Sequence, residues 1–217
     1  MDPVLKLKLI QERKLARRFR GSITRFIDSW FKTTPYARQA LINAAIYNLS
    51  NALYDHQRRT SLLVRGQTLT PGHRLHIADS NHLIGGVVKA LVEFEDNDLT
   101  KGEFRQRLRK WATNTAIRLT QRDVEQGRWA KIQQSTNGLI YKAWQSRMDG
   151  IERPDHHNAS LRYQAQPIPI NQPFVLGRLN SRLMFPGDPT LGAGPEQTFN
   201  CRCSVIYFNS DGKKLDG

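Results

Sequence analysis

Proline is distributed unevenly along this chain of 217 residues, and the distribution limits where long helices can form. Seven of the ten prolines follow residue 149, and none lies between Pro3 and Pro35. Proline ends or kinks a helix, because it lacks the backbone N–H and clashes with the preceding turn. We therefore expect long helices in the first two thirds of the chain, and short elements separated by loops in the last third.

Two apolar series recur at helical spacing near the start of the chain. The first extends from Leu5 to Trp30 and the second from Leu41 to His56. A Thr-Thr-Pro sequence separates them, and it suits the start of a helix, with threonine as the N-cap and proline in the first turn. The pattern predicts two successive helices within residues 1–66.

Two further helices are expected before residue 137. One covers about residues 80–95. The other follows Thr100 and Glu103, which fit a capping box, in which the two residues satisfy each other's free backbone N–H groups. Apolar residues three or four apart then continue from Phe104 to Leu119 and predict a long helix.

The last third has the composition of short strands. Residues 138–144, 178–185 and 202–208 are rich in apolar and aromatic side chains, and the segments between them are rich in Pro, Gly and Asn. The sequence therefore predicts an α+β protein. A basic, mainly helical body over residues 1–137 is followed by a small β-rich, loop-rich module over residues 138–217.

The net charge of +14 belongs entirely to residues 1–148. Residues 1–66 carry +9 and residues 67–148 carry +5, whereas residues 149–217 are neutral. Such a balance favours a polyanionic partner, nucleic acid first and an anionic membrane surface second. No run of 18 apolar residues is present, and lysines interrupt the apolar residues near the N-terminus. We therefore expect neither a membrane span nor a secretory signal.

The basic residues form three clusters, and the densest has no acidic residue between its members. Salt bridges along one helix therefore do not account for that cluster, whereas contact with DNA phosphates would, and such contact is blind to base sequence. The alternative is a solvated helix face, or one that docks on an acidic protein. The residues predicted to contact phosphate are Arg13, Lys14, Arg17, Arg18, Arg20, Arg58, Arg59, Arg105 and Arg109.

Cys201 and Cys203 are the only cysteines, and on a strand their side chains would share one face. A disulfide across this spacing would be strained, so a shared metal is easier. Zn²⁺ takes Cys and His ligands, and His156 is the predicted third ligand, with His157 or Asp149 to complete the site. The alternative is that both cysteines are small, reduced and partly buried side chains of a protein made in the cytosol.

Asp149, Arg153 and His156 are also predicted to act as structural polar ties, which join the proline-rich loop to the strands. In the catalytic alternative, His156 is a general base and Arg153 stabilises an anionic transition state, as in a metal-free nuclease. No nucleophile elbow, Walker loop, dinucleotide fingerprint or zinc-protease helix motif occurs in the sequence.

An ordered set of motifs in the last third resembles the phage Mu F-like family of minor head proteins. In that family, a tryptophan-bearing strand leads to an Asp-x-Arg-x-Arg-x-x-His stretch, a Pro-Gly-Asp turn and an Asn-Cys-Arg-Cys strand. Ile151 stands where the first arginine of the pattern is expected. The resemblance covers about residues 138–208, and the residues that carry it are Lys142-Ala143-Trp144, Asp149, Arg153-Pro154-Asp155-His156, Phe174, Met184-Phe185-Pro186-Gly187-Asp188-Pro189 and Asn200-Cys201-Arg202-Cys203.

The resemblance implies a minor capsid protein of a tailed bacteriophage. Such a protein would lie inside the phage head near the portal, in several copies, after assembly in the host cytoplasm and without a membrane. Its partners would be the portal protein and packaged double-stranded DNA, with the major capsid or scaffold protein as further candidates. It would assist head assembly and DNA delivery, and it would not be an enzyme. The alternative is a nuclease, or another enzyme acting on nucleic acid, that the virion delivers.

Overall fold

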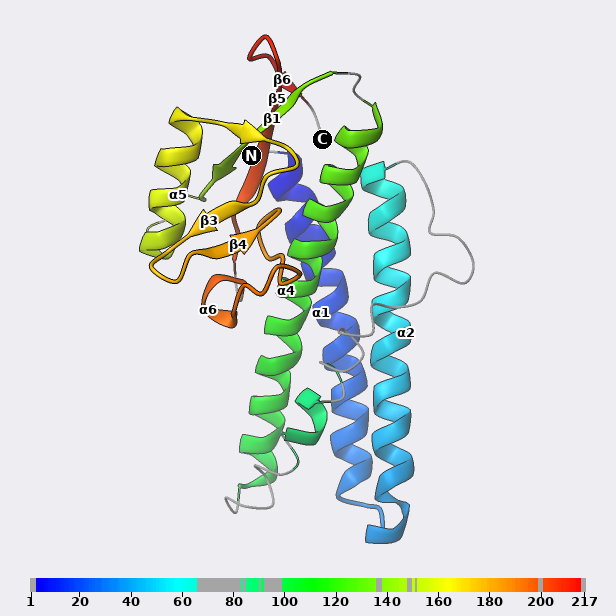
Figure 1. Ribbon diagram of the computed structural model, residues 1–217. Coiled ribbons are helices and arrows are strands. Elements are labelled where there is room, and N and C mark those ends of the chain that lie inside the picture. Colours follow the sequence, from blue (N-terminus) through cyan, green and yellow to red (C-terminus); the bar gives the residue numbers. More distant parts are fainter. Residues whose placement is uncertain are drawn as a thin grey trace. The chain divides into compact units, whose positions relative to one another are not determined.

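The computed structural model describes residues 3–65, 83, 85–89, 91, 99–135, 138–147, 150, 152–198 and 201–215. Long helices dominate the first part of the chain and a small antiparallel sheet the last part, so the α+β class is confirmed (Figure 1). The chain divides into two compact units, Met1–Arg59 with Thr68–Ile117, and Thr60–Gln67 with Arg118–Gly217. The divisions lie inside two helices, between Arg59 and Thr60 and between Ile117 and Arg118.

Three long helices supply the first unit. They are α1 (Pro3–Trp30), α2 (Arg38–Arg65) as far as Arg59, and the first half of α4 (Lys101–Ser135), and the 3₁₀ turn η1 (Pro35–Ala37) precedes α2. Residues 85–89 are also helical, within the segment where a helix was expected. The apolar series predicted from the sequence are buried along each helix: Leu15, Phe19, Ile23, Ile27, Ala45, Leu49, Leu53, Phe104, Leu108 and Ala112.

The predicted capping box at the start of α4 is confirmed. The Thr100 backbone N–H donates to Glu103 Oε2 at 2.9 Å, and the Glu103 N–H donates to Thr100 Oγ1 at 3.3 Å. Two of the free N–H groups at this helix end are thereby satisfied.

The second unit is built on a four-stranded antiparallel sheet in the order β2-β1-β5-β6. Its strands are β1 (Ile140–Gln145), β2 (Ile168–Pro169), β5 (Ser204–Asn209) and β6 (Lys214–Leu215). The hairpin of β3 (Phe174–Leu176) and β4 (Ser181–Leu183) is separate from this sheet. The strands predicted at 138–144 and 202–208 correspond to β1 and β5. The strand predicted at 178–185 is wrong over its first residues, which form the hairpin turn.

The second half of α4 packs on β5, and this contact explains where the units divide. Gln121 donates to the Cys203 carbonyl, Glu125 Oε2 accepts from the Val205 N–H at 3.3 Å, and Arg128 lies over the Tyr207 ring at 5.5 Å. Residues on one face of a helix recur every three to four positions, and alternate residues of a strand share one direction. The three contacts therefore lie along one face of α4 and follow alternate residues from Cys203 to Tyr207.

Helix α5 (Pro154–Ala165) occupies a segment that the sequence analysis described as a proline-rich loop. Pro154 stands in its first turn, where the missing N–H has no helical partner in any case. Its buried face places His156, Ala159, Ser160 and Tyr163 against the core. Another short helix, α6 (Pro195–Thr198), lies before the cysteines.

Aromatic side chains fill the core of the second unit. Phe174 contacts Trp144 and Tyr163 edge to face, with ring centroids 5.2 and 4.9 Å apart. Trp144 meets the His156 ring in the same way at 5.3 Å, so the core reaches the candidate site. Among the described helices, none has an apolar stretch long enough to cross a bilayer.

Candidate metal centre

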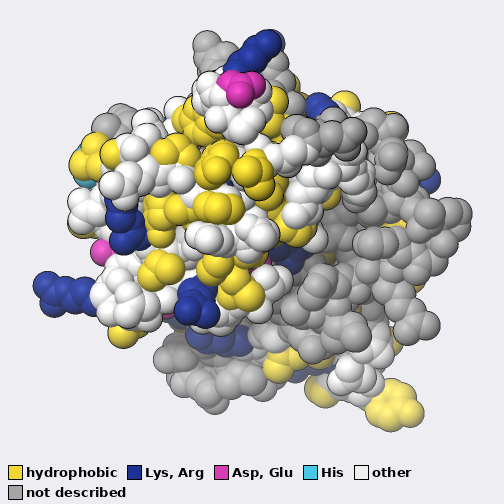
Figure 2. All heavy atoms as spheres, turned by 45° about the horizontal axis from the view of Figure 1, so that its top comes forward, with side chains coloured by type: hydrophobic (Ala, Val, Ile, Leu, Met, Phe, Trp, Pro, Cys, Tyr) yellow, Lys and Arg dark blue, Asp and Glu magenta, His cyan; other side chains and the backbone are white. Residues whose placement is uncertain are grey.

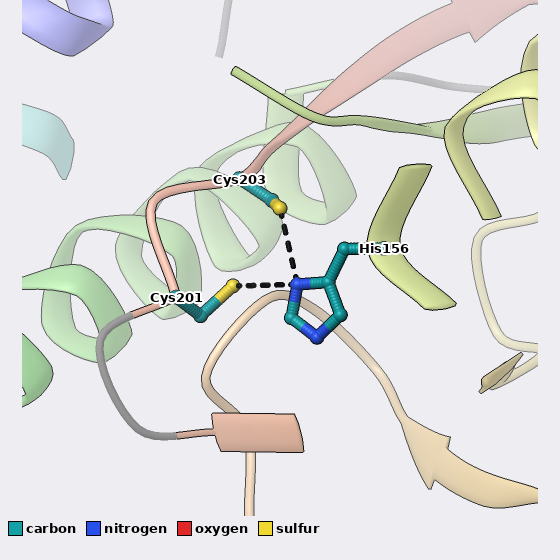
Figure 3. A group of neighbouring side chains, drawn as sticks. All are labelled: His156, Cys201 and Cys203. Carbon is teal, nitrogen blue, oxygen red and sulfur yellow. Dashed lines mark hydrogen bonds between the residues drawn. The ribbon is translucent and has the colours of Figure 1, made fainter. Parts of the chain in front are cut away.

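His156, Cys201 and Cys203 form a compact buried cluster in the second unit (Figure 3). His156 Nδ1 lies 3.3 Å from Cys203 Sγ and 3.6 Å from Cys201 Sγ. The three ligand atoms all lie within 4.8 Å of one another, and the three residues are only 1–3% exposed. The structure therefore brings together the residues that the sequence analysis predicted as metal ligands.

Local structure positions each ligand atom. His156 lies in the first turn of α5, and its N–H donates to the Arg153 carbonyl at 3.0 Å. The two cysteines lie immediately before β5, where alternate residues share a face. Gln121 of α4 holds the Cys203 carbonyl and so orients the cysteine segment.

A hydrogen-bonded relay orients the His156 ring from its other side. His156 Nε2 lies 3.0 Å from Gln197 Oε1, and Gln197 Nε2 donates to Asp155 Oδ2 at 2.9 Å. Because the Gln197 amide gives its N–H to a carboxylate, its oxygen faces His156 and accepts from Nε2–H. The Nδ1 lone pair then points at the two sulfurs. A partner on the distal nitrogen of this kind is usual for a metal-binding histidine.

The relay needs the glycine at position 177. Gly177 has φ 64° in the β3–β4 turn, and a Cβ there would lie 2.3 Å from Asp155 Oδ2 and 3.0 Å from Gln197 Nε2. Real Cβ atoms do not approach other atoms that closely. The turn therefore leaves room for the two residues that hold the histidine.

Electrostatics in the cluster favour a thiolate. In the metal-free cluster, burial raises the pKa of the Cys201 thiol, but a hydrogen bond from Cys203 and the hydrogen bond and charge of a His156 ring protonated on both nitrogens outweigh it and hold that pKa well below its ordinary value. A bound metal would take the place of the proton on Nδ1. A thiolate is the form of cysteine that binds metal. Two sulfurs and one imidazole nitrogen suit Zn²⁺ or another soft divalent ion, with a fourth position left for water or a further ligand.

The other residues predicted for this site have different placements. His157 is at the surface, with Nδ1 3.5 Å from Glu152 Oε1, and it does not join the cluster. Asp149 lies outside the described residues. Arg153 is the N-cap residue of α5, and its carbonyl accepts from both His156 and His157. Of the predicted polar ties, His156 thus connects α5 to the segment before β5.

The sequence analysis missed two members of the relay, Asp155 and Gln197. Asp155 directly precedes the histidine, and this adjacency was the available signal. Nothing in the sequence around Gln197 indicated its role, because α6 brings it to the site from a segment that reads as a loop.

A second polar tie fixes the Pro-Gly-Asp turn to β1. The fully buried Lys142 donates from Nζ to the Met184 carbonyl at 2.7 Å and lies 4.6 Å from the Phe174 ring centroid. Burial lowers the pKa of Lys142 to about 7, opposed by the charge of Asp188. Asp188 Oδ2 accepts from the Met184 N–H at 2.9 Å. Lys142 and Asp188 therefore hold the same residue from two sides.

The residues predicted to contact phosphate lie on the helices of the first unit, and all except the half-buried Arg105 are exposed. Two of them make ion pairs with neighbouring helices. Arg18 pairs with Asp55 of α2 at 3.1 Å, and Arg105 of α4 pairs with Asp28 of α1. The absence of acids along the sequence near Arg18 therefore did not exclude an acid from another helix.

The surface of the second unit has a different character. Figure 2 shows apolar and uncharged side chains gathered near the centre of the view, with several Lys and Arg side chains around them. Leu139, Leu161 and Leu179 are among the exposed apolar residues of this unit. Residues 149–217 carry no net charge. No family model, no curated protein and no solved structure matches the chain.

Proposed function

We propose that this chain is a minor head protein of a tailed bacteriophage, similar to the Mu F-like proteins. It would lie inside the head near the portal and assist head assembly and DNA delivery. One observation carries the proposal: motif residues far apart in the sequence meet in one buried cluster, with His156 against Cys201 and Cys203. A chance collection of short motifs has no reason to converge in space.

Other residues of the resemblance support the same proposal. Trp144 packs in the core, and Lys142 and Asp188 hold the Pro-Gly-Asp turn. Each of these side chains has a structural task within the second unit. Such tasks fit a module that serves assembly.

The basic helices supply the second part of the proposal, which is contact with packaged DNA. Arg13, Lys14, Arg17 and Arg20 are exposed on α1. Phosphate contacts made by such residues would release counterions, so binding would weaken steeply as salt rises. Duplex binding measured against salt concentration tests this part, and a flat response would contradict it.

The nuclease alternative gains no support from the site. His156 is 1% exposed, and both of its ring nitrogens have neighbours within hydrogen-bonding distance. A general base must reach the proton that it removes from its substrate or from water. The proposal therefore includes no catalytic activity.

Zn²⁺ is the proposed ion of the candidate metal centre. Zn²⁺ commonly takes Cys and His ligands. The relay from Asp155 through Gln197 holds Nε2–H and so presents the unprotonated Nδ1 of His156 to the ion. Bound zinc would join α5 to the segment before β5. Elemental analysis of protein purified without chelators should find about one zinc per chain, and a metal-free but folded protein would contradict the assignment.

Co-assembly tests the main proposal. The chain should be expressed with the portal protein encoded beside its gene, and the complex measured by sedimentation. We expect stable co-sedimentation with the portal, and we expect the chain in purified phage heads by mass spectrometry. Heads that contain the portal but lack this chain would overturn the proposal.

A further inference from the structure

A groove between α1 and α4 gathers cations on both of its rims. It has a volume of about 790 Å³ and lies wholly within the first unit. Arg17 and Arg20 stand on the α1 rim, and Arg109 and Lys110 stand on the α4 rim. These four residues come from two of the clusters found in the sequence, which lie about ninety positions apart.

The arginines that line the groove differ from other arginines of this unit in their partners. Arg18 and Arg105 have acidic partners on neighbouring helices. In contrast, no acidic side chain is among the described residues that line the groove. Arg109 donates to Thr24 Oγ1 at 3.2 Å, a neutral contact that orients the guanidinium and leaves its charge uncompensated. The groove is therefore a concentrated positive site.

The size and lining of the groove indicate the ligand. The lining runs from Arg17 to Thr24 on α1 and from Gln106 to Asn114 on α4, which is about 10–12 Å at 1.5 Å per helical residue. That length spans about three nucleotides of one strand along B-form DNA. Threonine, glutamine and asparagine side chains between the cations are the usual neutral partners of phosphate and sugar oxygens.

No aromatic side chain lines the described part of the groove. Proteins that bind single strands generally stack bases on aromatic rings, so this lining favours the backbone of a duplex. We propose that the α1–α4 groove binds the sugar–phosphate backbone of one strand of duplex DNA. The inference rests on the DNA contact in the proposed function and assigns it to one groove.

Matched variants of the full chain distinguish DNA binding in the groove from a general effect of positive charge on DNA affinity. Arg17→Ala with Arg20→Ala removes two groove cations, and Lys32→Ala with Lys101→Ala removes the same charge from exposed positions of this unit that are outside the lining and are not assigned to DNA contact. By fluorescence anisotropy with a labelled duplex, we expect the groove variant to bind about tenfold more weakly. Its log–log salt slope should fall by about two. The control variant should lose about threefold or less.

Gly21→Leu tests the shape of the groove at constant charge. Gly21 lines the groove, and a Cβ there meets only the end of the Arg25 side chain, at 3.9 Å. Leucine is also a better helix former than glycine, so the variant should fold. We expect the added side chain to obstruct the strand and to weaken duplex binding at least about fivefold.

The outcomes distinguish this inference from the proposed function. If the parent chain does not bind duplex DNA, both the DNA contact and the groove assignment fail. If the parent binds but the groove and control variants weaken equally, or Gly21→Leu binds normally, the groove assignment alone fails. Equal competition by polyglutamate would also overturn it, because the site would then recognise acidic chains in general.

Discussion

His156 Nδ1 lies 3.3 Å from Cys203 Sγ, although 47 residues separate them in the sequence. The contact joins the first turn of α5 to the segment that leads into β5. Both side chains are buried, so water does not compete for it. Loss of either partner should therefore affect the whole second unit.

His156→Ala should remove the bound metal and destabilise the second unit. It leaves Gln197 and two buried sulfurs without their partner, and unsatisfied buried polar groups cost about 1–3 kcal/mol each. We expect the free energy of unfolding to fall by about 2–4 kcal/mol, measured by urea denaturation beside elemental analysis. His157→Ala, at the half-buried neighbour outside the cluster, should cost less than about 0.5 kcal/mol and retain the metal. Equal effects of the two changes would refute the assigned role.

Gln197→Leu should weaken metal binding while it leaves the three ligands in place. The change removes the acceptor that holds His156 Nε2–H, and such partners typically contribute about 10–100-fold in metal affinity. Competition with a coloured zinc chelator measures the affinity. Glu196→Gln, at the exposed preceding residue, is the matched control and should leave it unchanged. Unchanged affinity in Gln197→Leu would show that the relay does not position the ring.

Gly177→Ala tests the space beside Asp155. The new Cβ would be strained by the positive φ and would also collide with Asp155 Oδ2. Gly192 has φ 84° with no atom within 4 Å of its would-be Cβ, so Gly192→Ala reports the backbone strain alone. We expect about 1 kcal/mol of destabilisation for Gly192→Ala and about 2–4 kcal/mol for Gly177→Ala, by thermal or urea unfolding. Similar costs at the two positions would mean that the collision is relieved without consequence.

Local patterns were sufficient to predict the parts of the structure that depend on neighbouring residues. The capping box of Thr100 and Glu103 is one case, and the common direction of the Cys201 and Cys203 side chains is another. The approach of His156 to them, across more than forty residues, depends on tertiary packing. The apolar series of α1, α2 and α4 also became buried faces, since helical periodicity is written directly into sequence.

Contacts that depend on tertiary packing could not be predicted in this way. The pairing of Arg18 with Asp55 joins two helices, so no spacing along α1 reveals it. Gln197 enters the relay only because α6 carries it there. Helix α5 was missed because its Pro154 signals both a loop and the first turn of a helix, and the buried face that decides between them includes polar residues such as Ser160.

The buried Lys142 should make the stability of the second unit depend on pH. Burial lowers the pKa of Lys142 to about 7 in the folded protein, whereas an unfolded lysine titrates near 10.4. Between these values the unfolded chain binds the extra proton, so the contribution of Lys142 to stability rises as pH increases from about 7 to 10.

Lys142→Met removes this titration at similar side-chain volume. Relative to the variant, the parent should gain up to about 1.4 kcal/mol of unfolding free energy per pH unit across that range. Urea denaturation at about pH 6.5, 8 and 9.5 measures the difference in unfolding free energy between parent and variant across this interval. The exposed Lys213, changed to Met, is the control for lysine removal at the surface. A parent–variant difference that stays constant with pH would mean that Lys142 remains protonated in the fold, held by the Met184 carbonyl and Asp188.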